Sequence, residues 1–256
     1  MAEHLVLVDP TCENVFAVCP VCGHQERFNR VTDLGTTRPI DSREVSCGNP
    51  ACATKYTIGG DLINPAHEML LYECGGMLKR KEYMQCILGL ARAYEVFFSH
   101  YVHVQLIFRP VGKDRETDLA EFNELLSTLD EKLKRFTFEP RRRLFLKMNI
   151  DGCAPATFAE SAALVASIPS DPRNIRKSAA EQLASLENAS LRDLCVRLSK
   201  SKIDTIRNRV VHKGAYRPTH GETLETLQDG YEIIPGLARE LRLHGTAEHY
   251  INGRDE

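Results

Sequence analysis

Hydrophobic and polar residues follow two different patterns along this 256-residue chain, and the pattern changes near residue 63. Before that point, short apolar runs are separated by glycine, proline, asparagine and aspartate, which predicts short β-strands joined by turns. The predicted strands are Val15–Val18, Arg27–Val31, Arg43–Ser46 and Lys55–Ile58. After it, apolar residues recur every three or four positions, as in amphipathic helices. We therefore expect two domains, residues 1–63 and residues 64–256.

The second domain is predicted to be a bundle of helices. Asn64 and Pro65 should open a short helix that stops at the glycine pair Gly75-Gly76. The longest predicted helix runs from Leu78 to Phe108. Its buried stripe should be formed by Tyr83, Ile87, Leu90, Tyr94, Phe97 and Phe98. Further helices are expected over Thr117–Phe136 (ended by Pro140), a short piece reaching Met148, Pro155–Ile168, Asn174–Glu187, Ser190–Lys213, and from a Thr219/Glu222 capping box to about His244.

The overall composition is that of a soluble globular protein. Hydrophobic residues make up 43% and charged residues 27% of the chain, with a net charge of −2. The longest mainly apolar stretch is interrupted by charged and polar side chains, so no membrane-spanning helix is expected. The first residues lack the basic start and apolar core of a signal peptide. These features favour a cytoplasmic location and a partner other than a membrane.

Positive charge is concentrated in two segments of the helical domain. Ser190–Arg217 holds eight basic and two acidic residues, which gives a local charge of +6. The basic residues are Arg192, Arg197, Lys200, Lys202, Arg207, Arg209, Lys213 and Arg217. We interpret a second basic run, between Lys132 and Lys147, as a solvated helix face. The first 63 residues carry −3 and are therefore a poor non-specific grip for RNA.

Four of the nine cysteines form two closely spaced pairs on predicted turns. Cys19 and Cys22 are followed by a glycine, and Cys47 and Cys52 enclose Gly48, Asn49 and Pro50. Four thiolates from two turns can close a tetrahedral zinc site, and the intervening strands make the segment resemble a zinc ribbon. A disulfide framework is the rival interpretation, but a cytoplasmic location disfavours it.

The second cysteine pair is spaced more widely than in many ribbons, which leaves the ligand set open. His24, Cys12 or Cys74 could replace one of the four cysteines. With four protein ligands there is no open position for a substrate, so the zinc is expected to be structural. Cys86, Cys153 and Cys195, scattered through helical sequence, are interpreted as small buried hydrophobes.

One short segment of the helical domain combines several kinds of polar chemistry. Arg207 and Asn208 precede His212 by five and four positions, so Asn208 and His212 should lie one turn apart on the same helix face. Ile203, Ile206 and Val210 should face inward. A guanidinium matches phosphate oxygens, and an imidazole can transfer protons near neutral pH. These side chains suit phosphodiester chemistry, although each is also common on ordinary helix surfaces.

This segment resembles the signature of the HEPN superfamily. The family pattern is an Arg-Asn pair, two β-branched residues and a histidine, followed by Lys-Gly and by Pro-Thr at the start of the last helix. The matching residues here are Arg207, Asn208, Val210, Val211, His212, Lys213, Gly214, Pro218 and Thr219. The helix around Leu88–Glu95 also resembles the first helix of that family. The resemblance covers most of residues 77–246, although the stretch from Glu139 to Arg173 is longer than the family pattern.

The resemblance implies a fold and an activity. The fold class would be mainly α, with a HEPN-like bundle preceded by a small β-rich zinc ribbon. Catalytic HEPN proteins are endoribonucleases that work without a metal ion and usually dimerise, so that two motifs face one cleft. Carried over to this chain, His212 would transfer protons, Arg207 would hold the scissile phosphate and Asn208 would orient it. Many members are toxins or antiviral defence effectors, some with a neutralising or activating protein partner.

Two other functions fit the same sequence. The chain could be a non-catalytic HEPN and zinc-ribbon protein that binds a nucleotide, RNA or a protein partner as an adaptor. Alternatively, it could be a zinc-ribbon regulator of nucleic acids whose helices only dimerise, but the ribbon lacks the basic face that such a regulator needs. No Gly-rich phosphate loop is present, which disfavours nucleotide hydrolysis.

Overall fold

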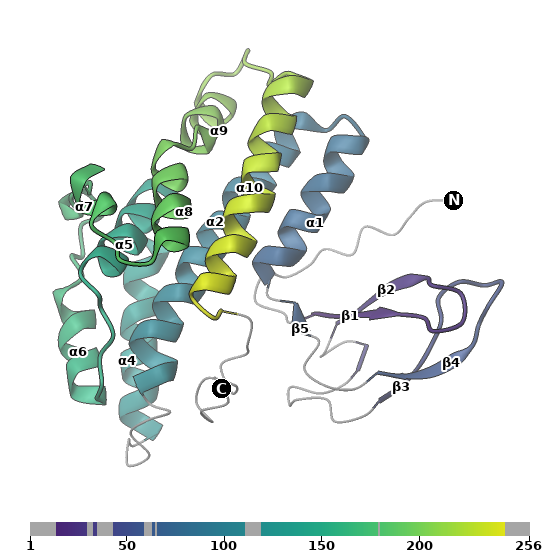
Figure 1. The fold of residues 1–256 in the computed structure, drawn as a ribbon, viewed down its shortest axis with the longest axis horizontal. Coiled ribbons are helices and arrows are strands. Elements are labelled where there is room, and N and C mark those ends of the chain that lie inside the picture. Colours follow the sequence, from purple (N-terminus) through teal and green to yellow (C-terminus); the bar gives the residue numbers. More distant parts are fainter. Residues whose placement is uncertain are drawn as a thin grey trace. The chain divides into compact units, whose positions relative to one another are not determined.

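The architecture is mainly helical, with a small β region near the N-terminus, which confirms the predicted secondary-structure class at this level (Figure 1). The computed structural model describes residues 14–29, 33–34, 43–58, 63–64, 66–110, 119–178 and 180–243. The chain divides into two compact units, residues 1–69 and 70–256. No helix in these ranges is both long and apolar enough to cross a membrane.

The first unit is built from two antiparallel hairpins. Strand β1 (Asn14–Val18) pairs with β2 (Gln25–Asn29), and β3 (Arg43–Ser46) pairs with β4 (Lys55–Ile58). A short strand, β5 (Ile63–Asn64), adds to the free edge of β1. The four predicted strands are confirmed, with β2 beginning two residues earlier than expected. Each pair of closely spaced cysteines lies in the turn of one hairpin.

The core of this unit is small. Alternate residues of the strands face inward, as the two-residue period of a strand requires. The buried residues are Val15, Ala17, Cys19, Leu34, Val45, Cys47, Tyr56 and Ile58. A core of this size stabilises a domain only marginally, so a metal staple is physically expected.

Helix α1 (Ala66–Lys79) continues through Gly75-Gly76, so the prediction that it stops there is wrong. The first of these glycines is required by packing. A Cβ atom at Gly75 would lie 2.7 Å from the hydroxyl of Tyr231, which itself donates to the carbonyl of Leu71 at 2.9 Å. The helix therefore uses glycine to let a neighbouring helix approach. The break comes later, at Lys81, whose φ of 63° is left-handed.

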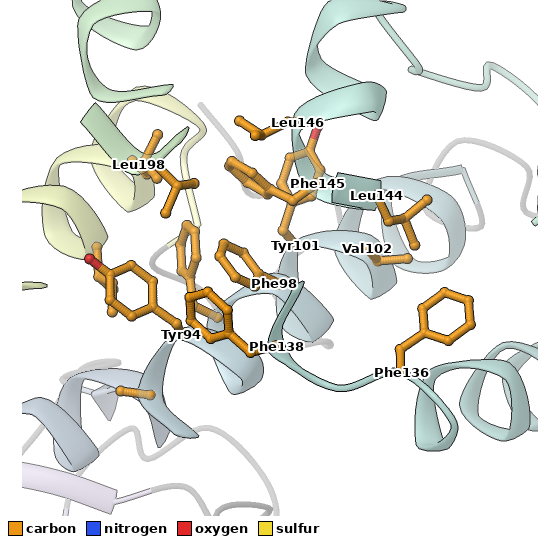
Figure 2. Packing of buried hydrophobic residues seen from close by; sticks show 14 of the residues in the cluster. Tyr94, Phe98, Tyr101, Val102, Phe136, Phe138, Leu144, Phe145, Leu146 and Leu198 are labelled. Carbon is orange, nitrogen blue, oxygen red and sulfur yellow. The ribbon is translucent and has the colours of Figure 1, made fainter. Parts of the chain in front are cut away.

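The central element of the second unit is α2 (Tyr83–His103), continued by a π-helical turn, η1 (Val104–Phe108). Helices α5 (Phe138–Ile150), α9 (Ile203–His212) and α10 (His220–Glu240) all pack against it (Figure 1). The predicted stripe is buried except for Tyr83, which is half-buried. Figure 2 shows its aromatic rings meeting those of α5, with Phe98 and Phe145 centred 5.2 Å apart and Tyr101 and Phe145 4.7 Å apart.

Helices α4 (Leu119–Lys134) and α5 (Phe138–Ile150) form one side of the bundle. Pro140 was expected to end the first of these, but it lies in the first turn of α5. Proline is tolerated there because the first N–H groups of a helix have no partner within the helix. Helix α4 instead ends at Lys134, before the turn that leads to Phe136 and Thr137.

The basic run between Lys132 and Lys147 is a solvated face only in part: Lys134, Arg135 and Lys147 are exposed, but for Arg141 and Arg142 the interpretation was wrong. The guanidinium of Arg141 donates to the carbonyls of Leu133 and Phe136 at 2.9 and 2.8 Å and to Ser99 Oγ at 2.7 Å. Arg142 is buried, is paired with Glu139, and faces carbonyls that end α8. These cations satisfy backbone carbonyls where helices end, which a linear charge count does not reveal.

The remaining described segments carry several shorter helices and one helix of 21 residues, as long as α2. They are α6 (Phe158–Ser167), η2 (Pro172–Asn174), α7 (Ala180–Ala184), α8 (Ala189–Lys200), α9 (Ile203–His212) and α10 (His220–Glu240). The predicted helix over Asn174–Glu187 shrinks to α7, and the one over Ser190–Lys213 is split at Ser201-Lys202. The capping box of Thr219 and Glu222 is confirmed, with both reciprocal hydrogen bonds formed.

Candidate functional site

The sulfur atoms of Cys19, Cys22, Cys47 and Cys52 form one cluster, all within 4.8 Å of one another. Two pairs cross between the hairpins: Cys19 Sγ lies 3.9 Å from Cys52 Sγ, and Cys22 Sγ lies 3.6 Å from Cys47 Sγ. Four sulfurs at about 2.3 Å from a tetrahedral zinc would be separated by about 3.8 Å. The cluster is thus a candidate metal site whose dimensions are compatible with zinc.

The backbone holds the two cysteine turns in a similar way. The N–H of Cys19 donates to the carbonyl of His24 at 2.9 Å, and the N–H of Cys47 donates to that of Thr54 at 2.9 Å. The first turn closes with Gly23 at φ 70°, a left-handed conformation that favours glycine. The two hairpins are linked by a hydrogen bond: the N–H of Gly48, in the second turn, donates to the carboxylate of Glu26, near the start of β2, at 2.9 Å.

The other three candidate ligands do not join the cluster in the described part of the chain. Cys74 is fully buried in the second unit, where its thiol donates to the carbonyl of Cys86 at 3.5 Å. His24 is exposed beside the first turn but is not a member of the cluster. Cys12 lies outside the described residues. Cys86 and Cys195 are fully buried, as expected, whereas Cys153 is half-buried.

The thiols of the cluster differ in acidity. Burial raises the pKa of Cys47 to about 12, and the nearby Thr54 hydroxyl lowers that of Cys52 to about 7. Metals bind thiolates, so a cation entering the site must displace the proton from Cys47. Asn49 Nδ2 lies 3.8 Å from Cys22 Sγ, near enough for its amide to support that sulfur. The arrangement suits a closed, four-sulfur site.

The second candidate site lies on α9. Ile203, Ile206 and Val210 are buried, which confirms the predicted inward face of this helix. Arg207 and Asn208 are half-buried beside them. His212 is exposed and is the last residue of the helix.

A chain of hydrogen bonds fixes two of the three predicted residues. Arg207 Nη1 donates to Asn208 Oδ1 at 3.0 Å, and Asn208 Nδ2 donates to Asp204 Oδ1 at 3.3 Å. The carboxylate thus orients the amide, whose oxygen then faces the guanidinium. Sequence reasoning missed Asp204, although its position four residues before Asn208 was a usable signal because such residues share a helix face.

His212 is not joined to the other two residues. Among the described residues, no hydrogen bond connects its imidazole to Arg207 or Asn208, and it lies one turn beyond Asn208. The chain therefore brings the arginine and the asparagine together and leaves the histidine facing solvent at the helix end. A histidine there is stabilised by the helix dipole when protonated.

Carboxylates of α10 lie opposite the basic segment and neutralise part of its predicted +6 charge. The pairs are Arg197 with Asp229 and Glu232 (3.6 and 2.6 Å), Lys202 with Glu225 (4.0 Å) and Arg209 with Glu222 (4.0 Å). Arg207, in contrast, forms no ion pair within the described ranges. The local positive field is weaker than the sequence suggests, and Arg207 is one of the basic side chains of this segment that keep their charge unpaired within the described residues.

Glu222 also organises the turn that follows α9. Its carboxylate accepts from the hydroxyl of Tyr216 at 3.0 Å and caps α10 through the N–H of Thr219 at 3.0 Å. The guanidinium of Arg209 lies over the Tyr216 ring, 5.1 Å from its centre. The backbone after His212 is therefore held close to the start of α10 by several contacts at one carboxylate.

Comparisons with known proteins do not assign this chain to a family. It matches no protein-family model, no curated protein and no solved structure.

Proposed function

We propose that this chain is a HEPN-type endoribonuclease whose catalytic residues are Arg207, Asn208 and His212, with a structural zinc ion in its N-terminal unit. The observation that carries the proposal is the state of Arg207. It is the arginine of α9 that has an amide partner but no carboxylate partner among the described residues. A guanidinium without a carboxylate partner is suited to receive a phosphate.

The proposed reaction is cleavage of RNA by its own ribose hydroxyl. His212, as the neutral imidazole, would remove the proton from the 2′-oxygen, which forms a bond to phosphorus. The bond from phosphorus to the 5′-oxygen breaks, and that oxygen takes a proton from water as it leaves. Arg207 would neutralise the charge that develops on the phosphate oxygens. The products would be a 2′,3′-cyclic phosphate and a 5′-hydroxyl.

Asp204 would act through Asn208, whose amide would hold the Arg207 guanidinium and orient the phosphate. Their hydrogen bonds limit the rotamers of the guanidinium, so less conformational entropy is lost when a phosphate binds. The proposal includes a homodimer in which two copies of the motif face one cleft, since one copy presents its groups on an open helix end. It also includes RNA as the substrate and a protein partner that neutralises or activates the nuclease.

We further propose that the metal is Zn²⁺ held by Cys19, Cys22, Cys47 and Cys52. The separations between their sulfurs fit its bond length, and thiolates are ligands that zinc prefers. Four protein ligands leave no position for a substrate, so the ion would supply stability to the small unit rather than chemistry. In this proposal all catalytic groups belong to α9.

The proposal is tested with the full chain and end-labelled single-stranded RNA. We expect the wild type to cut RNA in the presence of brief chelation and to leave cyclic phosphate ends. His212→Ala and Arg207→Ala should each lower cleavage by at least about a hundredfold, the range typical of a lost proton-transfer group or a lost donor to a charged transition state.

The controls separate nuclease activity from contamination and misfolding. Arg239→Ala removes an exposed arginine from α10 and should leave cleavage unchanged. Circular dichroism and zinc content should match the wild type in all variants. Equal cleavage by wild type and His212→Ala would indicate a contaminating enzyme and overturn the proposal. RNA binding without cleavage by wild-type dimers would favour the non-catalytic adaptor instead.

A further inference from the structure

A cavity of about 580 Å³ lies in the helical unit, apart from both candidate sites. It is bounded by η1, α5, α6 and the irregular segment that follows α6. None of the residues proposed for catalysis or metal binding lines it. Ligand pockets commonly measure roughly 300–1,000 Å³, whereas packing defects in a close-packed interior rarely exceed one water molecule. The volume therefore lies within the range of ligand pockets.

The floor of this cavity is aliphatic. Leu106, Leu144, Met148, Ile168 and Ile175 line it, and each is buried, with 2–6% of its surface exposed. None of the described lining residues is aromatic. A planar ring such as a nucleobase would find no stacking partner here, whereas a flexible hydrocarbon chain would find matching surface.

The rim of the same cavity is positively charged. Lys147 is offset by Asp151, whose carboxylate lies 2.5 Å from its ammonium group. Arg176 and Lys177 also line the cavity, are exposed, and form no ion pair within the described ranges. Two uncompensated cations at the opening of an apolar cavity complement one anionic group.

The walls are held in place by hydrogen bonds, so the cavity is formed before any ligand arrives. The ammonium of Lys132 donates to the carbonyls of Val165 and Ile168, each at 2.7 Å, at the end of α6. Arg143 Nη1 donates to the carbonyl of Ile175 at 3.3 Å. A preformed site loses little conformational entropy on binding, which favours affinity.

We propose that this cavity binds an aliphatic carboxylate, that is, the anion of an acyl chain. The hydrocarbon would lie over the floor of Leu106, Leu144 and Met148, and the carboxylate would face Arg176 and Lys177. The proposal does not depend on the nuclease activity of α9. It assigns the irregular segment after α6 a role as the wall and rim of a ligand site.

The test uses sodium decanoate, below its micelle concentration, and isothermal titration calorimetry on the full chain. We expect one decanoate per chain, and binding of the uncharged 1-decanol at least about tenfold weaker, as for the loss of one charge-assisted hydrogen bond. The double variant Arg176→Gln with Lys177→Gln should lose at least about the same factor. Arg173→Gln, a nearby exposed arginine paired with Asp171, is the matched control and should bind as the wild type does.

A second readout reports occupancy at the floor. Cys153 is half-buried and lines the cavity, so decanoate should slow its alkylation by N-ethylmaleimide, followed by peptide mass spectrometry. Leu164→Trp should fill the cavity and abolish decanoate binding. Three results would overturn the proposal: no binding by the wild type, equal binding by the charge variant, or adenosine monophosphate binding in place of decanoate.

Discussion

The arginines of this protein show how one side chain serves different purposes in different surroundings. Arg142 is buried against Glu139 and backbone carbonyls, Arg197 is paired with two carboxylates of α10, and Arg207 has only an amide partner. Arg142 stabilises the fold only because its partners offset the free-energy cost of burying a charged guanidinium. Arg207 remains able to bind an external anion, and this difference motivates the nuclease proposal.

A substitution of Arg141 tests whether arginines that bind backbone carbonyls stabilise the fold. Arg141→Met should lower the free energy of unfolding by about 2–4 kcal/mol, because several buried acceptors near α4 and α5 lose their donor. Urea unfolding followed by circular dichroism measures the change. Arg135→Met, an exposed arginine in the same basic run, should change stability by less than about 0.5 kcal/mol. Equal effects of the two variants would contradict a stabilising role for the hydrogen bonds of Arg141.

At the scale of elements, side chains at the helix ends form hydrogen bonds with the terminal backbone groups and so help to fix where each helix begins and ends. The capping box at the start of α10 ties that helix to the turn after α9 through Glu222. The ends of α4 and α6 are satisfied by long cationic side chains instead. Caps of both kinds matter because terminal N–H and C=O groups have no partner within the helix.

The capping box makes a prediction about α10. Thr219→Ala should destabilise the helical unit by about 1 kcal/mol, since the N–H of Glu222 loses its acceptor. The measurement is thermal or urea unfolding of the full chain. Thr205→Ala, an exposed threonine inside α9, should cost nothing, because alanine is the better helix former. If Thr205→Ala lowered the stability as much as Thr219→Ala does, the loss of the capping hydrogen bond would not be its cause.

A contact between α2 and α4 should make stability depend on pH. His103 places one ring nitrogen 2.7 Å from the carbonyl of Ser99 and the other 2.8 Å from Asp130, where it forms a hydrogen bond with the carboxylate. This bond lowers the pKa of Asp130 below its ordinary value of 3.8. The carboxylate therefore stabilises the fold above that value, and the contribution is lost as the pH falls through the lowered pKa.

Asp130→Asn measures this contribution. The variant should be less stable than the wild type near pH 5 by no more than about 1 kcal/mol, because Asp130 is half-exposed and solvent screens the pair. The difference should vanish at pH values below the lowered pKa. Glu131→Gln, the exposed neighbour, should show no such dependence. Urea titrations over a pH series give the comparison, and a difference that persists in acid would rule out this linkage.

At the scale of the whole molecule, the two units have unequal means of stability. The helical unit buries a large continuous core around α2, whereas the β unit buries a few strand residues around four cysteines. If the cluster binds zinc as proposed, metal binding should supply much of the folding energy of the small unit. The helical unit should not need it.

Prolonged chelation should therefore unfold the β unit and leave the helical unit folded. We expect loss of zinc and rapid proteolysis within residues 1–69, while the helical circular dichroism signal changes little. Cys47→Ser should have the same effect, and Cys153→Ser, a cysteine outside the cluster, should retain the metal. Elemental analysis and limited proteolysis are the measurements. Full retention of the β unit without metal would refute a structural role for the ion.

The sequence by itself determined the local features. The apolar periods, the cysteine turns and the Thr219 capping box each depend on residues a few positions apart, and the structure confirms the strands, the stripe of α2 and the cap. The clustering of Cys19, Cys22, Cys47 and Cys52 was also predictable, since two similar turns present thiols in the same way. Local geometry is sufficient for such predictions because backbone conformation limits neighbouring residues directly.

Tertiary structure alone decided what depends on distant partners. It placed the carboxylates of α10 against the basic segment and buried Arg142. It also brought the hydroxyl of Tyr231 so close to Gly75 that a side chain there would clash. The charge available to a ligand is a sum over groups close in space, and their separation along the chain does not specify that sum.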